Sequence, residues 1–139
     1  MDDAARYAEG MKTRRAVLGE AYVDKASSGL TGFNREWQEF ITRNAWNDVW
    51  NRSGLVRRER SIIVLSIAAA LGAWGEFRIH VRGALNNGLS RDEIKEVLMQ
   101  ASVYAGVPAA NHAFREAASV FAEIEAEAAE AAAKDTTTV

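Results

Sequence analysis

Hydrophobic residues recur along most of the chain at intervals of three and four positions, the spacing of one face of an α-helix. This pattern predicts helices over residues 4–18, 57–71 and 74–85, a further helix that follows Ser90 and is broken at AGVP, and a last helix that starts near Pro108. No segment shows the strict alternation of apolar and polar residues that is typical of a half-buried strand. The sequence therefore predicts an all-α protein.

An aromatic-rich segment lies between the first two of these helices. Thr31 can cap a further helix, which would carry Phe33, Trp37 and Phe40 on one packing face. Two more tryptophans follow, four positions apart, before a break at the sequence NRSG. With this helix the chain has about six main helices.

Helix-end signals surround the short connection NNGLS. Asn and Gly tolerate the left-handed conformation at a helix end, so Gly88 ends the helix over 74–85. Ser90 and Glu93 have the spacing of a capping box, which starts the next helix. We expect these two helices to form an antiparallel pair at the centre of the fold.

The segment SIIVLSIAAALGAW is the longest apolar run of the chain, at about 14 residues. A helix that spans a bilayer needs roughly 20 such residues, so the run predicts a buried helix. Because its later part is apolar nearly all round, it needs cover on every side. In a chain of 139 residues this indicates burial by a neighbouring subunit.

The chain length favours a single domain, and the composition changes near its end. We expect a helical domain over residues 1–125. Residues 126–139 are rich in Ala and Glu, then in Thr, and are predicted to form a solvated helix extension that frays into a disordered end.

Composition excludes several classes of function. The formal net charge of −2 provides no global basic field, so we expect no nucleic-acid partner. The chain has no cysteine, which excludes disulfides, thiolate metal ligands and thiol catalysis. The acidic start MDDAARYAEG lacks the apolar core of a signal peptide, so we expect a cytoplasmic protein without a membrane partner.

Glu76 and His80 are the first candidates for chemistry. They lie four positions apart in a predicted helix, so their side chains share one face. A carboxylate beside an imidazole can orient the ring and raise its pKa, which suits a general acid. The spacing alone favours an ion pair on the surface or at an interface, because such pairs are common on helices.

A metal site would need further ligands. His112 could join Glu76 and His80, but the chain has no HExxH motif and no spacing that brings His112 near the other two. We therefore expect no metal.

Arg60 is the arginine whose position is most unusual, because it enters the most apolar helix of the chain. A charge in such a helix needs a dedicated anionic partner, either a carboxylate of the protein or a carboxylate of a substrate. The four tryptophans are expected to pack in the core or at an interface, with the wall of a pocket as the alternative.

Three long strings resemble the γ-carboxymuconolactone decarboxylase family: ITRNAWNDVW, ALNNGLSRDEIKEVL and GVPAANHAF, in that order. The resemblance extends from about Arg6 to Phe121. It implies the all-α alkylhydroperoxidase D-like fold, assembled as a ring-shaped homo-oligomer that is typically a trimer of dimers.

Members of the wider superfamily carry a Cys-x-x-Cys pair followed by a histidine on the same helix. In this chain the histidine of that pattern is His80, whereas the two cysteine positions hold Ala73 and Glu76. A glutamate that serves the redox site in those relatives falls on Ser61. Peroxidatic disulfide chemistry is therefore excluded by the residues themselves.

The resemblance implies decarboxylation of 4-carboxymuconolactone, a lactone with two carboxylates, during protocatechuate degradation. The substrate can hold the electrons of the broken bond itself, so no cofactor is expected. Two alternatives remain: a paralogue that acts on another lactone or keto acid, and a non-catalytic oligomeric protein. For the decarboxylase function we expect that His80 donates the proton or stabilises the enolate and that Glu76 orients His80. The residues expected to bind the substrate are Arg60, Arg43, Trp46 and Tyr104.

Overall fold

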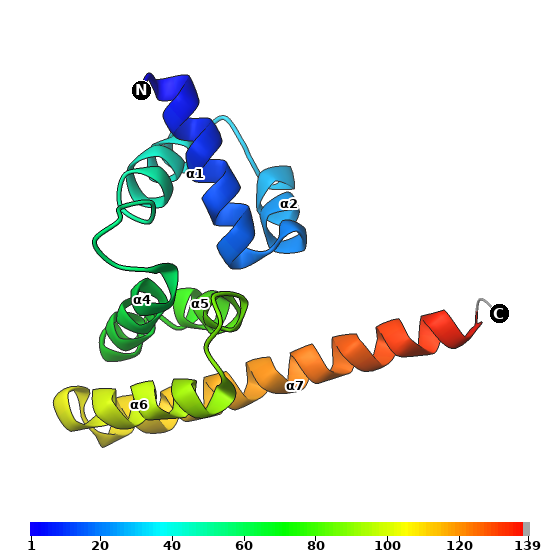
Figure 1. Cartoon of the computed structure of the whole chain (residues 1–139). Helices are drawn as coiled ribbons and strands as arrows, with labels where there is room; N and C mark the ends of the chain where they lie inside the picture. Colours follow the sequence, from blue (N-terminus) through cyan, green and yellow to red (C-terminus); the bar gives the residue numbers. More distant parts are fainter. Residues whose placement is uncertain (138–139) are drawn as a thin grey trace.

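The computed structural model describes residues 1–137, and within them it contains seven α-helices, one π-helix and no strand. The all-α prediction is confirmed. Figure 1 shows that the helices before residue 50 lie above a lower layer built from the helices after residue 56. The elements are α1 (Asp3–Leu18), α2 (Glu20–Ser28), α3 (Arg35–Ile41), the π-helix (Thr42–Asn47), α4 (Arg57–Leu71), α5 (Trp74–Asn86), α6 (Arg91–Ala105) and α7 (Val107–Thr137).

Local end signals account for the boundaries of the later helices. The predicted capping box of α6 is present, because the Glu93 amide donates to Ser90 Oγ and the Ser90 amide donates to Glu93 Oε1, both at 3.0 Å. Gly88 has a φ of 96°, which lies in the left-handed region that glycine favours. The predicted range of α4 matches the structure.

The start of α3 differs from the prediction. Thr31 does not cap the helix, because its hydroxyl oxygen accepts from the Asn34 amide at 3.3 Å and its own amide donates to Asn34 Oδ1 at 2.8 Å, in a turn that precedes the helix. The helix then begins at Arg35. The aromatic face expected to pack is uncovered within one chain: Phe33 is 98% exposed, and Trp37 and Phe40 are also exposed.

The larger hydrophobic core lies between α4, α5, α6 and α7, and we call it the aliphatic core. Leu65, Phe77, Ile94 and Leu98 are among its fully buried members. The most extensive helix pairings here are α4 with α5, α4 with α6, and α6 with α7. The prediction of a central pair formed by α5 and α6 is therefore wrong.

The antiparallel pair is instead formed by α6 and α7. Arg91 at the start of α6 lies over the ring of Phe121 in α7, with its guanidinium carbon 4.7 Å from the ring centroid. The same arginine donates to Glu125 at 2.6 Å. The reason is that only Gly106 separates α6 from α7, so the chain reverses directly after α6 and the two apolar stripes meet.

A second hydrophobic cluster joins α1, α2, the π-helix and α5, and we call it the aromatic cluster. It contains Val17, Leu18, Val23, Trp46 and Trp50. Helix α1 approaches the π-helix so closely that a Cβ atom at position 10 would lie 2.0 Å from the carbonyl oxygen of residue 42. A glycine at this position therefore permits the contact that holds the tryptophans in place.

Helix α5 lies between the two hydrophobic regions. Phe77 and Val81 face the aliphatic core, whereas Ile79 packs against the aromatic cluster. The Asn86 side chain fixes the end of α5 to α1 by donating to the carbonyl oxygen of Val17 at 2.7 Å.

The Ala/Glu-rich end of the chain is helical as far as the structure describes it. Helix α7 continues through Thr137 and extends beyond the other helices (Figure 1). The disorder predicted for the end of the tail falls partly on residues 138–139, which lie outside the described residues. The division at residue 125 stays a prediction.

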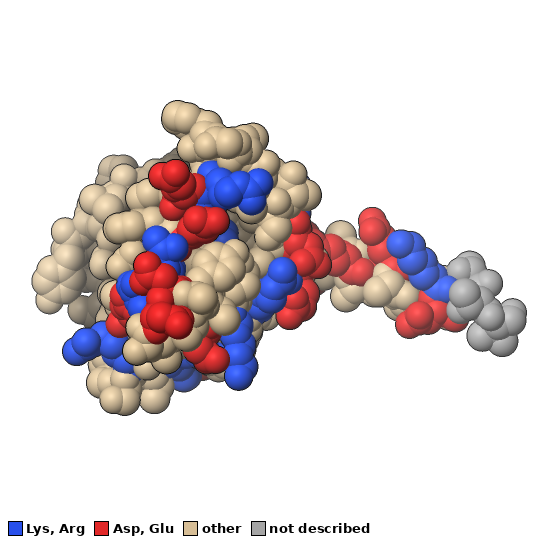
Figure 2. Space-filling model, turned by 90° about the horizontal axis from the view of Figure 1, so that it is seen from above, with Lys and Arg blue, Asp and Glu red and all other residues tan. Residues whose placement is uncertain are grey.

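Three properties of the helices and of their surface bear on partners. On the face shown in Figure 2, acidic and basic side chains are interspersed, so this face presents no continuous basic surface. No helix within residues 1–137 is long and apolar enough to cross a membrane. Helix α4 leaves Ile63, Ile67 and Leu71 exposed, so its all-round apolar character is not fully covered within one chain.

Candidate active site

His80 is the central residue of the candidate site and lies in the middle of α5. Its side chain is buried, with only 6% of the residue exposed. The imidazole lies beside the indoles of Trp46 and Trp50, with centroid distances of 6.0 and 5.9 Å and nearly parallel planes. The two indoles stack on each other at 5.0 Å. The structure thus brings two of the predicted site residues, His80 and Trp46, into contact.

The environment of His80 favours its neutral form. Nδ1 is buried and has no hydrogen-bond partner in the protein. Burial among the aromatic rings lowers the pKa of His80 to about 4, because an imidazolium there would lose its hydration. At pH 7 the imidazole is therefore neutral, and its Nδ1 has no hydrogen-bond partner among residues 1–137.

This result corrects the expected effect of Glu76. The sequence analysis expected the carboxylate to orient the ring and raise its pKa. Glu76 Oε2 lies 3.8 Å from His80 Nε2, which is beyond hydrogen-bond distance. The Glu76 side chain is also 69% exposed, so water screens its charge. The effect of burial is larger, and it acts in the opposite direction.

Arg14 in α1 is a buried cation that the sequence analysis did not single out. It is 7% exposed, and its Nε atom has no hydrogen-bond partner in the protein. The sequence does contain a signal for the burial of Arg14, because this residue lies four positions after Gly10 and three before Val17, on the same helix face. Both of those residues are buried.

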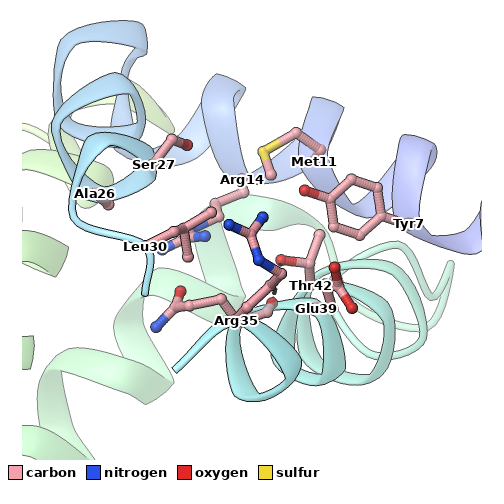
Figure 3. Close-up of a pocket in the computed structure, with 10 residues that line it drawn as sticks. Tyr7, Met11, Arg14, Ala26, Ser27, Leu30, Arg35, Glu39 and Thr42 are labelled. Carbon is pink, nitrogen blue, oxygen red and sulfur yellow. Dashed lines mark hydrogen bonds between the residues drawn. The ribbon is translucent and has the colours of Figure 1, made fainter. Parts of the chain in front are cut away.

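Arg14 lines a small cavity of about 50 Å³ (Figure 3). Tyr7 and Met11 reach it from α1, whereas Arg35 and Glu39 reach it from α3 (Figure 3). The remaining lining residues come from α2, the loop after it, α3 and the π-helix: Ala26, Ser27, Leu30, Gln38 and Thr42.

Tyr22 connects this cavity electrostatically with the histidine site. Burial raises the pKa of Tyr22, and the nearby carboxylate of Glu76 raises it further. The positive charge of Arg14 acts in the opposite direction on the same hydroxyl. Tyr22 is thus close enough to both Arg14 and Glu76 for their charges to change the pKa of its hydroxyl.

The structure places Arg60 near the aromatic cluster. Its Nη2 donates to the Arg52 carbonyl oxygen at 3.0 Å, and its buried Nε has no partner in the protein. Its side chain forms no ion pair with a carboxylate of residues 1–137. Arg60 lies one helical turn before Val64, which packs against the aromatic cluster. The protein carboxylate predicted as one possible partner of Arg60 is thus not found within residues 1–137. A backbone carbonyl accepts from Nη2 instead, and Nε has no acceptor.

Arg43 is half-buried in the π-helix, three positions before Trp46. Its charge contributes to lowering the pKa of Asp48, although Arg6, which hydrogen-bonds Asp48, is the larger cause. Arg43 and Arg60 therefore occupy elements that border the site, as the prediction requires, and their role in binding substrate stays a prediction.

Tyr104 does not join the site within one chain. It is 82% exposed and lies on α6, beside a surface hollow lined by Ser66 and Ala70 of α4 and by other residues of α6. None of these residues belongs to the aromatic cluster.

The second histidine is also separate from the site. His112 stacks on Trp74 with a centroid distance of 4.0 Å, and its Nε2 lies 3.4 Å from Glu116. In the part of the chain that the structure describes, no group of three or more His, Cys, Asp or Glu side chains could hold a metal ion.

Ser61 occupies the position at which the family resemblance places the glutamate of a redox site, and it has a structural role. Ser61 is fully buried, and its hydroxyl accepts a hydrogen bond from the Asn87 side chain at 2.8 Å. Ser61 therefore serves to join α4 to the end of α5.

Comparison with known proteins gives the family of the chain. A family model described as carboxymuconolactone decarboxylase matches residues 35–119. A 4-carboxymuconolactone decarboxylase from Acinetobacter baylyi is 43% identical over 124 residues, which cover 89% of this chain and 92% of that protein.

Two further relatives share parts of the chain. A nitrosuccinic acid decarboxylase from Metarhizium robertsii is 46% identical over 100 residues, or 72% of this chain and 70% of that protein. A 4-carboxymuconolactone decarboxylase from Pseudomonas putida is 54% identical over 48 residues, or 34% of this chain and the full length of that sequence. The chain belongs to the carboxymuconolactone decarboxylase family.

Proposed function

We propose that this protein decarboxylates 4-carboxymuconolactone to β-ketoadipate enol-lactone and CO₂ without a cofactor. The observation that carries the proposal is His80, a buried neutral histidine with an unpartnered ring nitrogen beside two tryptophans. The family supports the reaction class, since named relatives of this chain are decarboxylases of small carboxylates.

The substrate supplies its own electron sink. When the bond between the ring carbon and the departing carboxylate breaks, its electron pair moves through the C=C bond to the lactone carbonyl oxygen. The pair returns when the carbon next to that carbonyl forms a bond to a proton. Atoms and charges then balance with one proton taken up and one CO₂ released, and no cofactor is required.

His80 fits the delivery of this proton if substrate binding changes its charge. In the free protein burial lowers the pKa of His80 to about 4. The two negative charges of the substrate favour the imidazolium, so they raise the pKa again when the substrate lies against the ring. His80 then takes a proton from water on binding and donates it to carbon in the reaction.

Other side chains have supporting roles in the proposal. Arg60 and Arg43 bind substrate carboxylates, and Arg60 has a buried unpartnered Nε to do so. Trp46 provides an apolar wall, which favours loss of the carboxylate charge as CO₂. Glu76 hydrogen-bonds His80 Nε2 after a small approach from its present 3.8 Å, once the ring is charged.

The proposal includes a ring-shaped homo-oligomer, a trimer of dimers. The exposed residues Ile63 and Ile67 lie on the same face of α4 as Ser66 and Ala70, which line the hollow beside Tyr104. A neighbouring subunit on this face would cover the apolar side chains and would contact Tyr104. Tyr104 then contributes to a pocket only across subunits. A cytoplasmic location stays a prediction.

The test is direct turnover. Purified protein is added to enzymatically prepared 4-carboxymuconolactone, and lactone absorbance and CO₂ release are followed together. We expect both signals to change in equal amounts, without added metal or cofactor. Loss of lactone without CO₂ would indicate an isomerase or hydrolase, and no change in either signal would overturn the proposal.

A second candidate substrate follows from the Metarhizium robertsii relative, which is named for nitrosuccinic acid. Nitrosuccinate also carries two carboxylates on a small skeleton. Measuring kcat/KM for both compounds under the same conditions decides between them.

A further inference from the structure

Arg14 is a buried arginine without an anionic partner, and its burial requires a physical explanation. The Arg14 side chain is nine-tenths buried, yet within residues 1–137 it forms no hydrogen bond and no ion pair. Its neighbour Arg15, in contrast, is paired with Glu20 and Asp24 at the surface. Burial of an unpaired charge is unfavourable, so proteins retain such a group where a ligand supplies the opposite charge.

The cavity beside Arg14 has the size and polarity for one carboxylate group. Its volume of about 50 Å³ corresponds to about four water-sized groups, which is too small for a whole lactone. Gln38 also lines it, and the buried Oε1 of Gln38 has no partner in the protein. The side-chain amide of Gln38 and the hydroxyl groups of Ser27 and Tyr7 provide further donors. A ligand could place one anionic arm here, with the rest of its atoms outside.

The cavity shares walls with the His80 site. Met11 lines the cavity and also packs against the aromatic cluster. Thr42 lines it too and lies one turn before Trp46, whose indole contacts His80. An arm that enters the cavity therefore belongs to a molecule that can reach the tryptophans.

We propose that the Arg14 cavity is the subsite for the substrate carboxylate that is retained in the product. This inference rests on the proposed decarboxylase function. A guanidinium that holds a carboxylate by two hydrogen bonds stabilises its charge, and this opposes its departure as CO₂. Arg14 thus suits the carboxylate that stays. Arg60 and Arg43 then attract the departing carboxylate, which lies against the apolar tryptophans beside His80 and is not held by a pair of hydrogen bonds.

Glu39 is the protein group that could compete for this role, because it lines the same cavity (Figure 3). It forms no ion pair with Arg14 in the structure. If Glu39 held Arg14 as an internal partner, Glu39→Gln would weaken folding and leave the KM unchanged. If the cavity serves the substrate, Glu39→Gln lowers the KM, because it removes a negative charge near the bound carboxylate.

The test compares Arg14→Gln and Arg14→Lys with the matched control Arg15→Gln from the next position of the same helix. We expect Arg14→Gln to raise the KM for 4-carboxymuconolactone by at least about 30-fold, with kcat changed much less. Arg14→Lys keeps the charge but not the planar fork, so its KM should lie in between. Arg15→Gln should keep both constants.

Thermal unfolding with 50 mM succinate, a simple dicarboxylate probe, separates this inference from the proposed function. Succinate should raise the Tm of the wild type and of Arg15→Gln, but not that of Arg14→Gln, whereas neutral succinamide should raise none. This result can be obtained even if the lactone is not turned over. Equal succinate shifts in wild type and Arg14→Gln, an unchanged KM, or failure of both Arg14 variants to fold would overturn the inference.

Discussion

The two hydrophobic regions on either side of α5 treat buried polar groups differently. In the aliphatic core the buried polar side chain is Ser61, and Asn87 satisfies its hydroxyl. On the side of the aromatic cluster, His80 and Arg14 are buried with ring or guanidinium nitrogens that have no partner in the protein. Helix α5 thus separates a region whose buried polar group is hydrogen-bonded from a region whose buried nitrogens lack hydrogen-bond partners.

This difference assigns different tasks to the two regions. The aliphatic core gains free energy from burial and contains no unpartnered buried side-chain atom among the described residues. The aromatic cluster accepts unfavourable burial of a histidine and an arginine, and their free nitrogens become useful only when a ligand binds. Changes on one side should alter stability, and changes on the other should alter catalysis.

The largest effect on stability is expected from Phe77→Ala. Phe77 is fully buried in the aliphatic core, and removal of its ring should lower the free energy of unfolding by about 3–5 kcal/mol. Urea denaturation measures this loss. The kcat of the remaining folded protein should stay near that of wild type, and a large fall in kcat at full folding would contradict the division between the two regions.

Part of the acid sensitivity of the protein should come from His80, on the side of α5 that faces the aromatic cluster. The folded state holds the pKa of His80 at about 4, below the value of about 6.5 in an unfolded chain, so unfolded molecules bind the proton more readily. The contribution of His80 to the free energy of unfolding is therefore constant above pH 6.5. It falls by about 3 kcal/mol as pH decreases from 6.5 to 4.

The His80→Gln variant isolates this contribution, because glutamine does not titrate. Free energies of unfolding measured between pH 4 and pH 7 should fall less steeply for the variant than for wild type. Equal slopes for the two proteins would show that His80 does not titrate with a lowered pKa.

The same substitution should reduce turnover about 100-fold or more, because it removes the proposed proton donor. Steady-state kinetics measures the loss, with circular dichroism and size-exclusion chromatography to confirm that fold and assembly are retained. A turnover rate within about threefold of wild type would remove His80 from the mechanism.

The parts of the fold that depend on local signals could be predicted from the sequence. The capping pair of Ser90 and Glu93, and the glycine at position 88, determine where α5 ends and α6 begins. The start of α3 could not be predicted in this way, because Thr31 has two local options. It forms a turn with Asn34 instead of a helix cap.

The candidate site could be predicted only in part. Spacing and family resemblance identified His80, but its lowered pKa depends on Trp46 and Trp50, which lie 34 and 30 positions away in the sequence. Arg14 escaped notice because its burial arises from packing of α1 on the π-helix. Its cavity is lined by residues of α1, α2, α3 and the π-helix, so it forms only when these consecutive elements pack on one another.

Gly10→Ala tests the contact that supports the aromatic cluster. A methyl group there would lie 2.0 Å from the Thr42 carbonyl oxygen, so α1 or the π-helix must move apart. We expect a loss of about 1–3 kcal/mol in the free energy of unfolding, together with a lower kcat because Trp46 shifts. Tryptophan fluorescence and steady-state kinetics measure both effects.

Gly75→Ala is the matched control for this substitution. Gly75 also lies in a helix, but an added Cβ meets no atom within 4 Å. Alanine there should raise the free energy of unfolding by up to about 1 kcal/mol, since it restricts the unfolded chain. If both variants behaved alike, the close approach of α1 to the π-helix would not determine the site.

The smallest effect is expected from shortening α7, which lies on the aliphatic side and far from the site. Residues 128–136 are exposed, and the helix there extends past the rest of the chain. Glu127 still contacts the folded body, because it accepts hydrogen bonds from Arg82 at 2.8 and 3.0 Å. A chain that ends at Glu127 should therefore match wild type in kcat, KM and urea midpoint.

A chain that ends at Ala126 also loses this exposed ion pair, which Arg82 partly replaces through Glu123 at 3.2 Å. Its urea midpoint should fall slightly, and the fall should disappear in high salt, because water and ions screen such pairs. Its kcat should not change, since no residue from Glu127 onward lines the Arg14 cavity or stacks on His80. A loss of activity or of assembly on removing residues 128–139 would show that the end of α7 belongs to a subunit interface, and the separation between a stabilising side and a catalytic side would then hold only for the isolated chain.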